Sequence, residues 1–68
     1  MKISIIHNVY KRNPHINESV RYNIEALKKS NVDYQYIIFN DKGDKEIYED
    51  TKDILDPNLE YYYSEHNF

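Results

Sequence analysis

Two polar segments of the chain combine an aromatic ring with a carboxylate. Asn8 and Tyr10 follow a first apolar run, residues 3–6, and Asp41 follows a second one, residues 36–39. A tyrosine ring can stack on a nucleobase, and a carboxylate or an amide can hydrogen bond to the ring N–H and carbonyl groups of the base. These are the groups that nucleotide binding needs. The sequence has neither GxxxxGK nor GxGxxG, which excludes the two common glycine-rich phosphate motifs.

The apolar patterns predict three strands, each ending at a polar segment. The first strand covers residues 3–6 and is apolar on both faces, the second covers 34–39, and the third covers 59–63. Ligands of open parallel sheets bind beyond the carboxyl ends of the strands, because backbone N–H groups and helix N-termini converge there. We therefore expect the polar segments after the three strands to meet at one edge of the sheet.

Two amphipathic helices are predicted between the strands. In the first, over residues 17–30, Asn17 acts as the N-cap and Asn31 supplies a left-handed stop. Before the second, the turn at Lys42-Gly43 uses the only glycine, and Asp44 caps the helix. The buried face of the first helix carries Ile16, Val20, Ile24 and Leu27, and that of the second carries Ile47, Thr51, Ile54 and Leu55. The predicted fold class is α/β, a parallel sheet in a single β-α-β-α-β unit.

One face of this sheet is expected to be bare. With right-handed crossovers and the strands in the order 3-2-1, both helices lie on the same face. The other face then exposes a larger apolar area than a soluble monomer normally shows. We expect this area to contain isoleucines of the first strand, two of residues 36–39, and the set Leu59, Tyr61 and Tyr63. Further polypeptide or a second copy of the chain should cover it.

Length and composition limit what the chain can do alone. Its 68 residues fit one small domain, residues 1–68. The formal net charge of -3 disfavours a general attraction to nucleic acid or to an anionic membrane. The opening run of residues 1–6 is too short for the central region of a signal peptide and for a membrane span. The absence of cysteine is compatible with export but favours a reducing compartment, so we predict a cytoplasmic protein.

Other residue patterns point less clearly to chemistry. The acidic residues between positions 41 and 53 lack the spacing of a calcium-binding loop and are typical of a solvated helix face. His7, His15 and His66 have no metal-ligand spacing. His7 and His66 can both approach the strand-end edge, but packing or solvent exposure is the default expectation for each. The aromatic run 61–63 is split between two faces of a strand, which disfavours a platform for nucleic-acid bases. We predict no metal site and no nucleic-acid partner.

The strand-end segments resemble the amino-terminal part of the family 2 glycosyltransferases. In that family the first strand closes in Pro-Val-Tyr-Asn and the second ends in Asp-Asp-Gly-Ser, and the corresponding segments here are ISIIHNVYKR (residues 3–12) and YIIFNDKGD (residues 36–44). The resemblance covers essentially all 68 residues. It implies a Rossmann-like unit, the amino-terminal half of the GT-A fold, that binds a nucleoside diphosphate sugar. By this resemblance Tyr10 matches the tyrosine beside the uracil, Asp41 the aspartate that contacts the base, and Asn8 a proline or threonine beside the nucleotide.

The same resemblance implies a division of roles within a longer protein. Members of the family displace a nucleoside diphosphate from a sugar donor with an acceptor hydroxyl, and the reaction inverts the sugar configuration. A divalent metal, Mg or Mn, neutralises the leaving phosphates, and a carboxylate takes the acceptor proton. The family's metal-binding Asp-x-Asp motif and its catalytic base come later than the segment matched here. We therefore expect the donor-binding part of a glycosyltransferase, inactive alone, with no catalytic and no metal-binding residue of its own.

Departures from the family pattern leave the identity of the base open. Asn40 stands in place of the first aspartate, Lys42-Gly43 in place of Gly-Ser, and Lys11 in place of an asparagine.

Two other functions are open beside the one that the resemblance implies. One alternative is a small non-catalytic module that dimerises or docks a partner through the bare sheet face. The other is a phosphoryl-acceptor domain that uses Asp41, for which the sequence does not place the further acidic and lysine partners.

Overall fold

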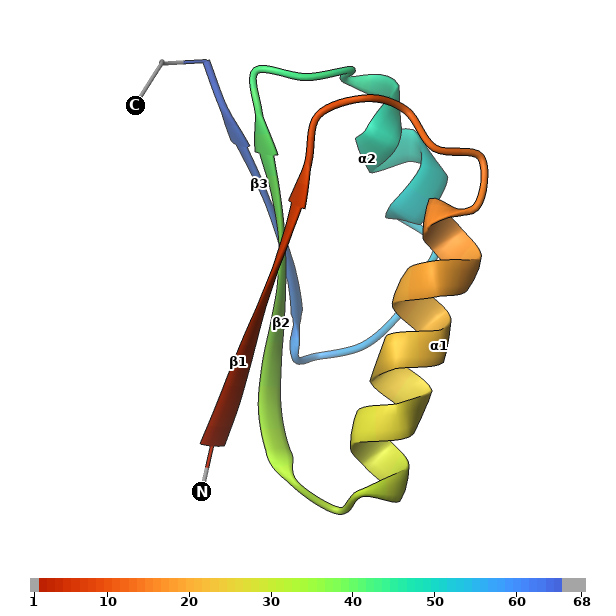
Figure 1. Cartoon of the computed structure of the whole chain (residues 1–68), viewed down its shortest axis with the longest axis vertical. Helices are drawn as coiled ribbons and strands as arrows, with labels where there is room; N and C mark the ends of the chain where they lie inside the picture. The colour runs from red at the N-terminus through yellow and green to blue at the C-terminus, as the bar shows by residue number, and fades with distance from the viewer. Residues whose placement is uncertain (1, 66–68) are drawn as a thin grey trace.

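The computed structural model describes residues 2–65 as an α/β unit with two layers. The elements are β1 (Lys2–Val9), α1 (Ile16–Lys29), β2 (Asp33–Asp41), α2 (Glu46–Thr51) and β3 (Leu59–Ser64). Both strand pairings are parallel and β2 lies in the middle of the three-stranded sheet (Figure 1). The predicted fold class, element order and strand order are confirmed. No helix within residues 2–65 is long and apolar enough to span a membrane.

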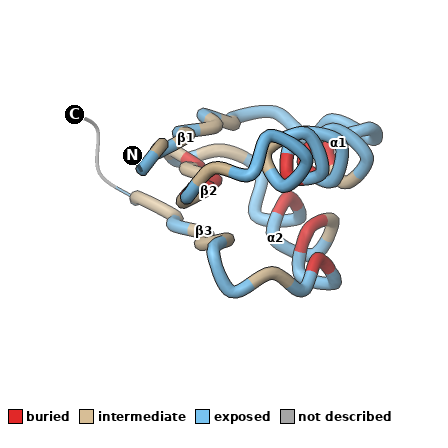
Figure 2. The backbone as a smooth tube through the Cα atoms, turned by 90° about the horizontal axis from the view of Figure 1, so that it is seen from below, coloured by how far each residue is buried: buried red, intermediate tan, exposed pale blue. Residues whose placement is uncertain are grey.

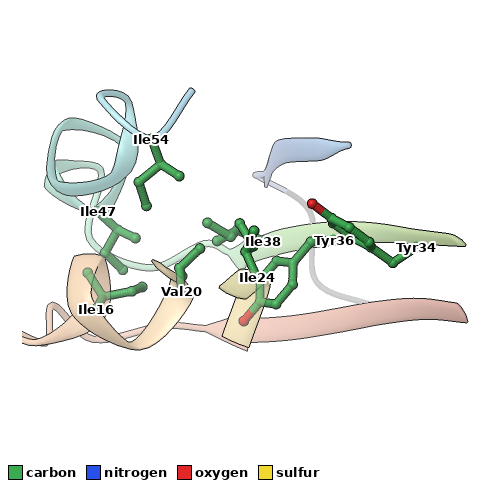
Figure 3. Close-up of a cluster of buried hydrophobic side chains, with 8 residues drawn as sticks. All are labelled: Ile16, Val20, Ile24, Tyr34, Tyr36, Ile38, Ile47 and Ile54. Carbon is green, nitrogen blue, oxygen red and sulfur yellow. The ribbon is translucent and has the colours of Figure 1, made fainter. Parts of the chain in front are cut away.

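Both helices pack on the same face of the sheet, as Figure 2 shows from the end of the sheet. The predicted spacing in α1 turns Ile16, Val20 and Ile24 toward the sheet, where all three are buried. Their side chains meet those of β2 and of the α2 segment (Figure 3). The resulting core consists of Ile16, Val20, Ile24, Tyr34, Tyr36, Ile38, Ile47 and Ile54. A single core therefore lies on one side of the sheet.

The start of α1 differs from the sequence-based expectation. Asn17 is inside the helix and is not the N-cap, which is His15 without a side-chain cap. Instead, Asn17 Nδ2 donates to the Asp50 carbonyl oxygen at 2.9 Å and to Asp53 Oδ1 at 2.8 Å. These bonds join α1 to α2 and to the segment that follows it, while Asn17 Oδ1, the atom that a cap would use, accepts from Arg21 Nε at 2.8 Å. The predicted left-handed stop is confirmed, because Asn31 has a φ of 56°.

The second helix is shorter than expected. It has six residues and begins after Lys45, so Asp44 does not cap it. Ile54 still reaches the core, but Leu55 is 91% exposed and was wrongly assigned to the buried face. The physical reason is that the chain has left the helix by residue 52, so helical spacing no longer decides which side chains face the sheet.

The face of the sheet opposite the helices has a different composition from the one predicted. Leu59 and Tyr61 pack against the core, and the Tyr48 ring of α2 lies edge-on to Tyr61 at a centroid distance of 5.1 Å. The prediction that Leu59, Tyr61 and Tyr63 are on the bare face is therefore wrong. The open face, as we call it below, carries Ile6, Asn8, Ile37, Phe39, Asp41 and Tyr62. Asn8, Phe39 and Tyr62 pair across the three strands and form one row on it.

Candidate nucleotide-binding site

The carboxyl ends of the strands form a hollow that contains all three predicted site residues. Since β1 and β2 are parallel, the loops that follow them leave the sheet at the same end (Figure 1). The hollow has a volume of about 400 Å³ and is lined by Asn8, Val9, Tyr10, Phe39, Asp41 and Lys42. We call it the strand-end hollow. The structure thus brings Asn8, Tyr10 and Asp41 together around one open space.

Tyr10 and Asn8 present unused polar and aromatic groups to this hollow. Tyr10 is 61% exposed, so its ring is available for stacking without repacking of the core. Asn8 lies on the open face and is also exposed. Within residues 2–65, neither the Asn8 amide nor the Tyr10 hydroxyl makes a hydrogen bond to another side chain or to the backbone. Both groups can therefore contact a ligand without breaking an existing contact.

Asp41 contributes a buried acceptor without a donor. Its Oδ1 atom is screened from solvent and has no hydrogen-bond partner in the part of the chain that the structure describes. A buried polar atom without a partner costs about 1–3 kcal/mol. A ligand N–H that displaces the atoms covering Oδ1 would remove that cost, and Asp41 lines the hollow from which such a ligand would approach.

A buried amide closes the loop after β2 and links it to β3. Asn40 is fully buried, and its Nδ2 donates to the Asp44 carbonyl oxygen at 2.8 Å and to Tyr61 Oη at 3.0 Å. Its Oδ1 accepts from the Gly43 N–H at 2.8 Å. Sequence reasoning identified Asn40 only as a departure from a family pattern. An asparagine two residues before Lys42-Gly43 is well placed to accept a hydrogen bond from the backbone of the turn. The sequence could have indicated this role of Asn40.

Gly43 is needed for a close approach and not for a left-handed turn. The residue with positive φ is Lys42, at 60°, which corrects the expectation that the glycine supplies the unusual backbone angle. A Cβ atom on Gly43 would lie 2.0 Å from the Tyr10 carbonyl oxygen and 2.6 Å from Asn40 Oδ1. Beside it, the Asp44 N–H donates to the Tyr10 carbonyl at 2.9 Å. The backbone after β1 and the backbone after β2 are therefore in direct contact.

Arg12 fixes the same loop from the other side. Its backbone N–H donates to Asp44 Oδ2 at 2.7 Å, and its guanidinium binds both carboxylate oxygens of Asp50 at 2.8 Å. The hydrogen bonds between the two groups raise the pKa of Arg12 and lower the pKa of Asp50. Asp50 and Asp53 thus bind residues of other elements, which the interpretation of the acidic run as a solvated helix face did not include.

His7 lies away from the strand-end hollow. Its Nδ1 is 2.8 Å from Tyr36 Oη, and Asn23 Nδ2 donates to the same hydroxyl at 3.0 Å. The Tyr36 hydroxyl can donate its own proton to His7 Nδ1 while it accepts from Asn23, an arrangement in which neutral His7 carries its proton on Nε2. His7 therefore packs between β1 and α1, which is the default expected for it, and does not approach the strand-end edge. His66, for which the same two placements were open, lies outside the described residues.

This environment predicts a loss of stability in mild acid. Burial lowers the pKa of His7. The unfolded chain, with a histidine pKa of about 6.5, then binds a proton more readily than the folded chain, so stability should fall as the pH drops below about 6.5. Urea unfolding at a series of pH values from neutral to mildly acidic should show this fall. It should be smaller in His7→Gln, and an equal pH dependence in His7→Gln and the unmodified chain would contradict the assignment.

The residues of the hollow do not form a divalent metal site. Asp41 is the one carboxylate that lines it, and Lys42 is adjacent. Mg²⁺ and Mn²⁺ bind preferentially to several oxygen ligands, and a neighbouring ammonium group opposes their charge. No group of three or more metal-ligating side chains occurs within residues 2–65. We derive no step through a metal from these residues.

A second, larger hollow lies on the helix side, far from the strand ends. Its volume is about 580 Å³, and it is bounded by α1 and residues 54–56. Arg21 pairs with Asp53 at 3.3 Å, and Lys28 pairs with Asp56 at 3.5 Å. Since its basic groups already have acidic partners, this hollow offers less to a ligand than the smaller one.

Comparisons with known proteins do not assign the chain to a family. No family model, no curated protein and no solved structure matches it. The resemblance to the family 2 glycosyltransferases stays a prediction that depends on the residues quoted for it.

Proposed function

We propose that this chain is the donor-binding part of a glycosyltransferase with a Rossmann-like, GT-A fold, and that the strand-end hollow binds the nucleoside of a nucleoside diphosphate sugar. One observation carries the proposal. Asn8, Tyr10 and Asp41, which the sequence resemblance selects from two distant segments, line the same hollow. Adjacent parallel strands bring these two segments together in any such sheet, and the resemblance adds that the residue types at this edge suit a nucleoside.

Each of the three residues has a distinct role in the proposal. The exposed Tyr10 ring stacks on the base, and the unpartnered Asp41 Oδ1 accepts a ring N–H of the base. The Asn8 amide hydrogen bonds at the edge of the nucleoside. Phe39 forms an apolar part of the lining of the strand-end hollow, beside these three polar residues.

The proposal assigns catalysis to polypeptide beyond this unit. The divalent metal, Mg or Mn, and the catalytic base of the presumed glycosyltransferase belong to that polypeptide, so the chain alone is expected to be inactive. Sugar transfer from the donor would invert the anomeric carbon, with the acceptor hydroxyl losing its proton to the base. A cytoplasmic location is part of the same proposal.

Titration with uridine and guanosine diphosphates tests the function. We expect saturable binding that is weak, because the rest of the donor pocket is absent, and that is best followed by amide chemical shifts. Tyr10→Ala should weaken binding by roughly 5-fold to 100-fold, since stacking of one base on an aromatic side chain contributes about 1–3 kcal/mol. Asp41→Ala should have an effect of similar size, because it removes a charged acceptor.

Two variants provide matched controls. Asp33→Ala removes a carboxylate from the opposite end of β2, and Tyr22→Ala removes an exposed tyrosine from α1. Neither should change nucleotide affinity. Undiminished binding by Asp41→Ala, or an equal loss in Asp33→Ala, would count decisively against the proposed role of the hollow.

A second candidate function is self-association through the open face, as a non-catalytic interaction module. The observation that favours it is the apolar character of this face, where Ile6 is 62% and Tyr62 50% exposed. Light scattering over a range of concentrations tests it. A tight dimer that nucleotide does not change, and that Ile37→Lys converts to a monomer, supports the module. A monomer that binds nucleotide supports the donor site instead.

A further inference from the structure

A third hollow, lined by basic residues, adjoins the strand-end hollow. It has a volume of about 460 Å³ and is lined by Tyr10, Lys11, Arg12, Lys42, Gly43 and Asp44. Tyr10 and Lys42 line both hollows, so the two spaces meet at these residues. We call it the basic hollow. A ligand that stacks on Tyr10 can therefore extend from one hollow into the other.

The charge of the basic hollow is opposite to that of the chain. Three of its six lining residues are cationic and one is anionic, although the net charge of the chain is -3. The Arg12 guanidinium is already bound to Asp50, and the Asp44 carboxylate accepts from the Arg12 backbone N–H. Lys11 and Lys42 make no ion pair with any residue in the range 2–65. Two ammonium groups are thus available to an anion.

The backbone that carries these lysines is held in place before any ligand binds. The Tyr10 carbonyl accepts from the Asp44 N–H, and the Lys42 N–H donates to the Ser64 carbonyl at 2.8 Å. The Arg12 contacts fix the same loop on its far side. Preorganisation of this kind lowers the entropy cost of binding, since the two loops need not be ordered by the ligand.

We propose that Lys11 and Lys42 bind the phosphate groups of the nucleotide whose base occupies the strand-end hollow. This inference rests on the proposed function and adds a specific element to it: phosphate recognition by lysines of this chain, without a metal ion. Lysine acts on phosphate as a point charge that does not require the planar geometry of an arginine pair. The affinity of the chain should therefore rise with the number of phosphates even when EDTA is present.

The test compares uridine, uridine monophosphate, uridine diphosphate and pyrophosphate in low-salt buffer with EDTA. We expect the diphosphate to bind about tenfold more tightly than uridine, because each exposed charge pair contributes roughly a twofold to fivefold gain. This gain should disappear in the double variant Lys11→Gln/Lys42→Gln and at high salt, where exposed charges are screened. Glutamine is one atom shorter than lysine, but it stays polar, adopts positive φ at position 42 no less readily, and removes the charge.

Lys29→Gln is the matched control. It removes one positive charge, half of the change in the double variant, at the end of α1, which lies at the opposite end of the sheet from the two loops (Figure 1). Its affinity for uridine diphosphate should equal that of the unmodified chain. A loss in Lys29→Gln as large as that in Lys11→Gln alone and in Lys42→Gln alone would show a general charge effect and overturn the assignment.

The remaining outcomes separate this inference from the proposed function. If uridine and uridine diphosphate bind equally tightly, the phosphate role of Lys11 and Lys42 is wrong and the base site stands. If pyrophosphate binds as tightly as the diphosphate, the basic hollow is a simple anion site and the ligand does not span both hollows. If neither uridine nor its phosphates bind, the proposed function fails and this inference fails with it.

Discussion

Replacement of Gly43 by alanine is expected to destabilise the fold by more than about 3 kcal/mol and to abolish nucleotide binding. The added Cβ would overlap the Tyr10 carbonyl oxygen and Asn40 Oδ1, at 2.0 and 2.6 Å. Tyr10 and Asn40 contribute a backbone carbonyl and the side chain of a buried residue, neither of which can move freely. The chain must therefore separate the two loops, which breaks the hydrogen bonds to Tyr10 and Asn40 and opens the hollow.

The loss is large relative to the stability that a chain of this size has. A protein of 68 residues is expected to unfold with a free energy of about 3–10 kcal/mol, at roughly 0.05–0.15 kcal/mol per residue. Urea unfolding measures the change directly. Lys42→Gly is the control in the same loop: Lys42 has positive φ, so glycine fits there, and its stability should change by less than about 1 kcal/mol. A Gly43→Ala protein with an unchanged midpoint would contradict the contact geometry.

Asn40→Asp is expected to cost about 3 kcal/mol or more, although it changes a single NH₂ group to oxygen. Asn40 Nδ2 donates to the Asp44 carbonyl and to Tyr61 Oη. A carboxylate cannot donate to the Asp44 carbonyl, and it places a negative charge at a residue that solvent does not reach. Protonation would restore a donor, so the variant should be least stable at neutral pH and recover part of the loss in acid.

Asn8→Asp makes the same chemical change at an exposed position of β1. Its stability should stay within about 0.5 kcal/mol of the unmodified chain, as is usual for surface substitutions. Thermal or urea unfolding of the two variants at neutral and mildly acidic pH provides the comparison. Equal stabilities of Asn40→Asp and Asn8→Asp at neutral pH would show that the buried amide does not organise the loops.

Regular burial is the part of this fold that the sequence predicts well. The spacing of Ile16, Val20 and Ile24 can satisfy only one face of a helix, and the structure buries these three residues. The run from Tyr36 to Phe39 has apolar residues on both faces, which is typical of a central strand in a parallel sheet, and β2 is central. Element order and strand order follow from such local patterns together with the handedness of crossovers.

Contacts between distant segments explain what the sequence did not predict. The face on which Tyr61 lies depends on Tyr48 and Asn40, and alternation alone is compatible with either face. Asn17 is a good N-cap by type, but bonds to residues 33 and 36 positions away use its amide instead. In the site, the positions of Tyr10 and Asp41 could be predicted because both follow the ends of strands. The link that Asn40 makes to β3 could not, because its partner Tyr61 is 21 residues later in the chain.

The row of Asn8, Phe39 and Tyr62 on the open face links two events that would otherwise be independent. Asn8 and Phe39 also line the strand-end hollow, so any layer that packs on this face touches two residues of the proposed nucleotide site. If a bound nucleotide changes the affinity of the chain for the covering layer by some factor, thermodynamic reciprocity requires that the layer change the affinity for the nucleotide by the same factor. If the covering layer is a second copy of the chain, this coupling makes the measured nucleotide affinity depend on protein concentration. Affinities of variants should consequently be compared at the same protein concentration.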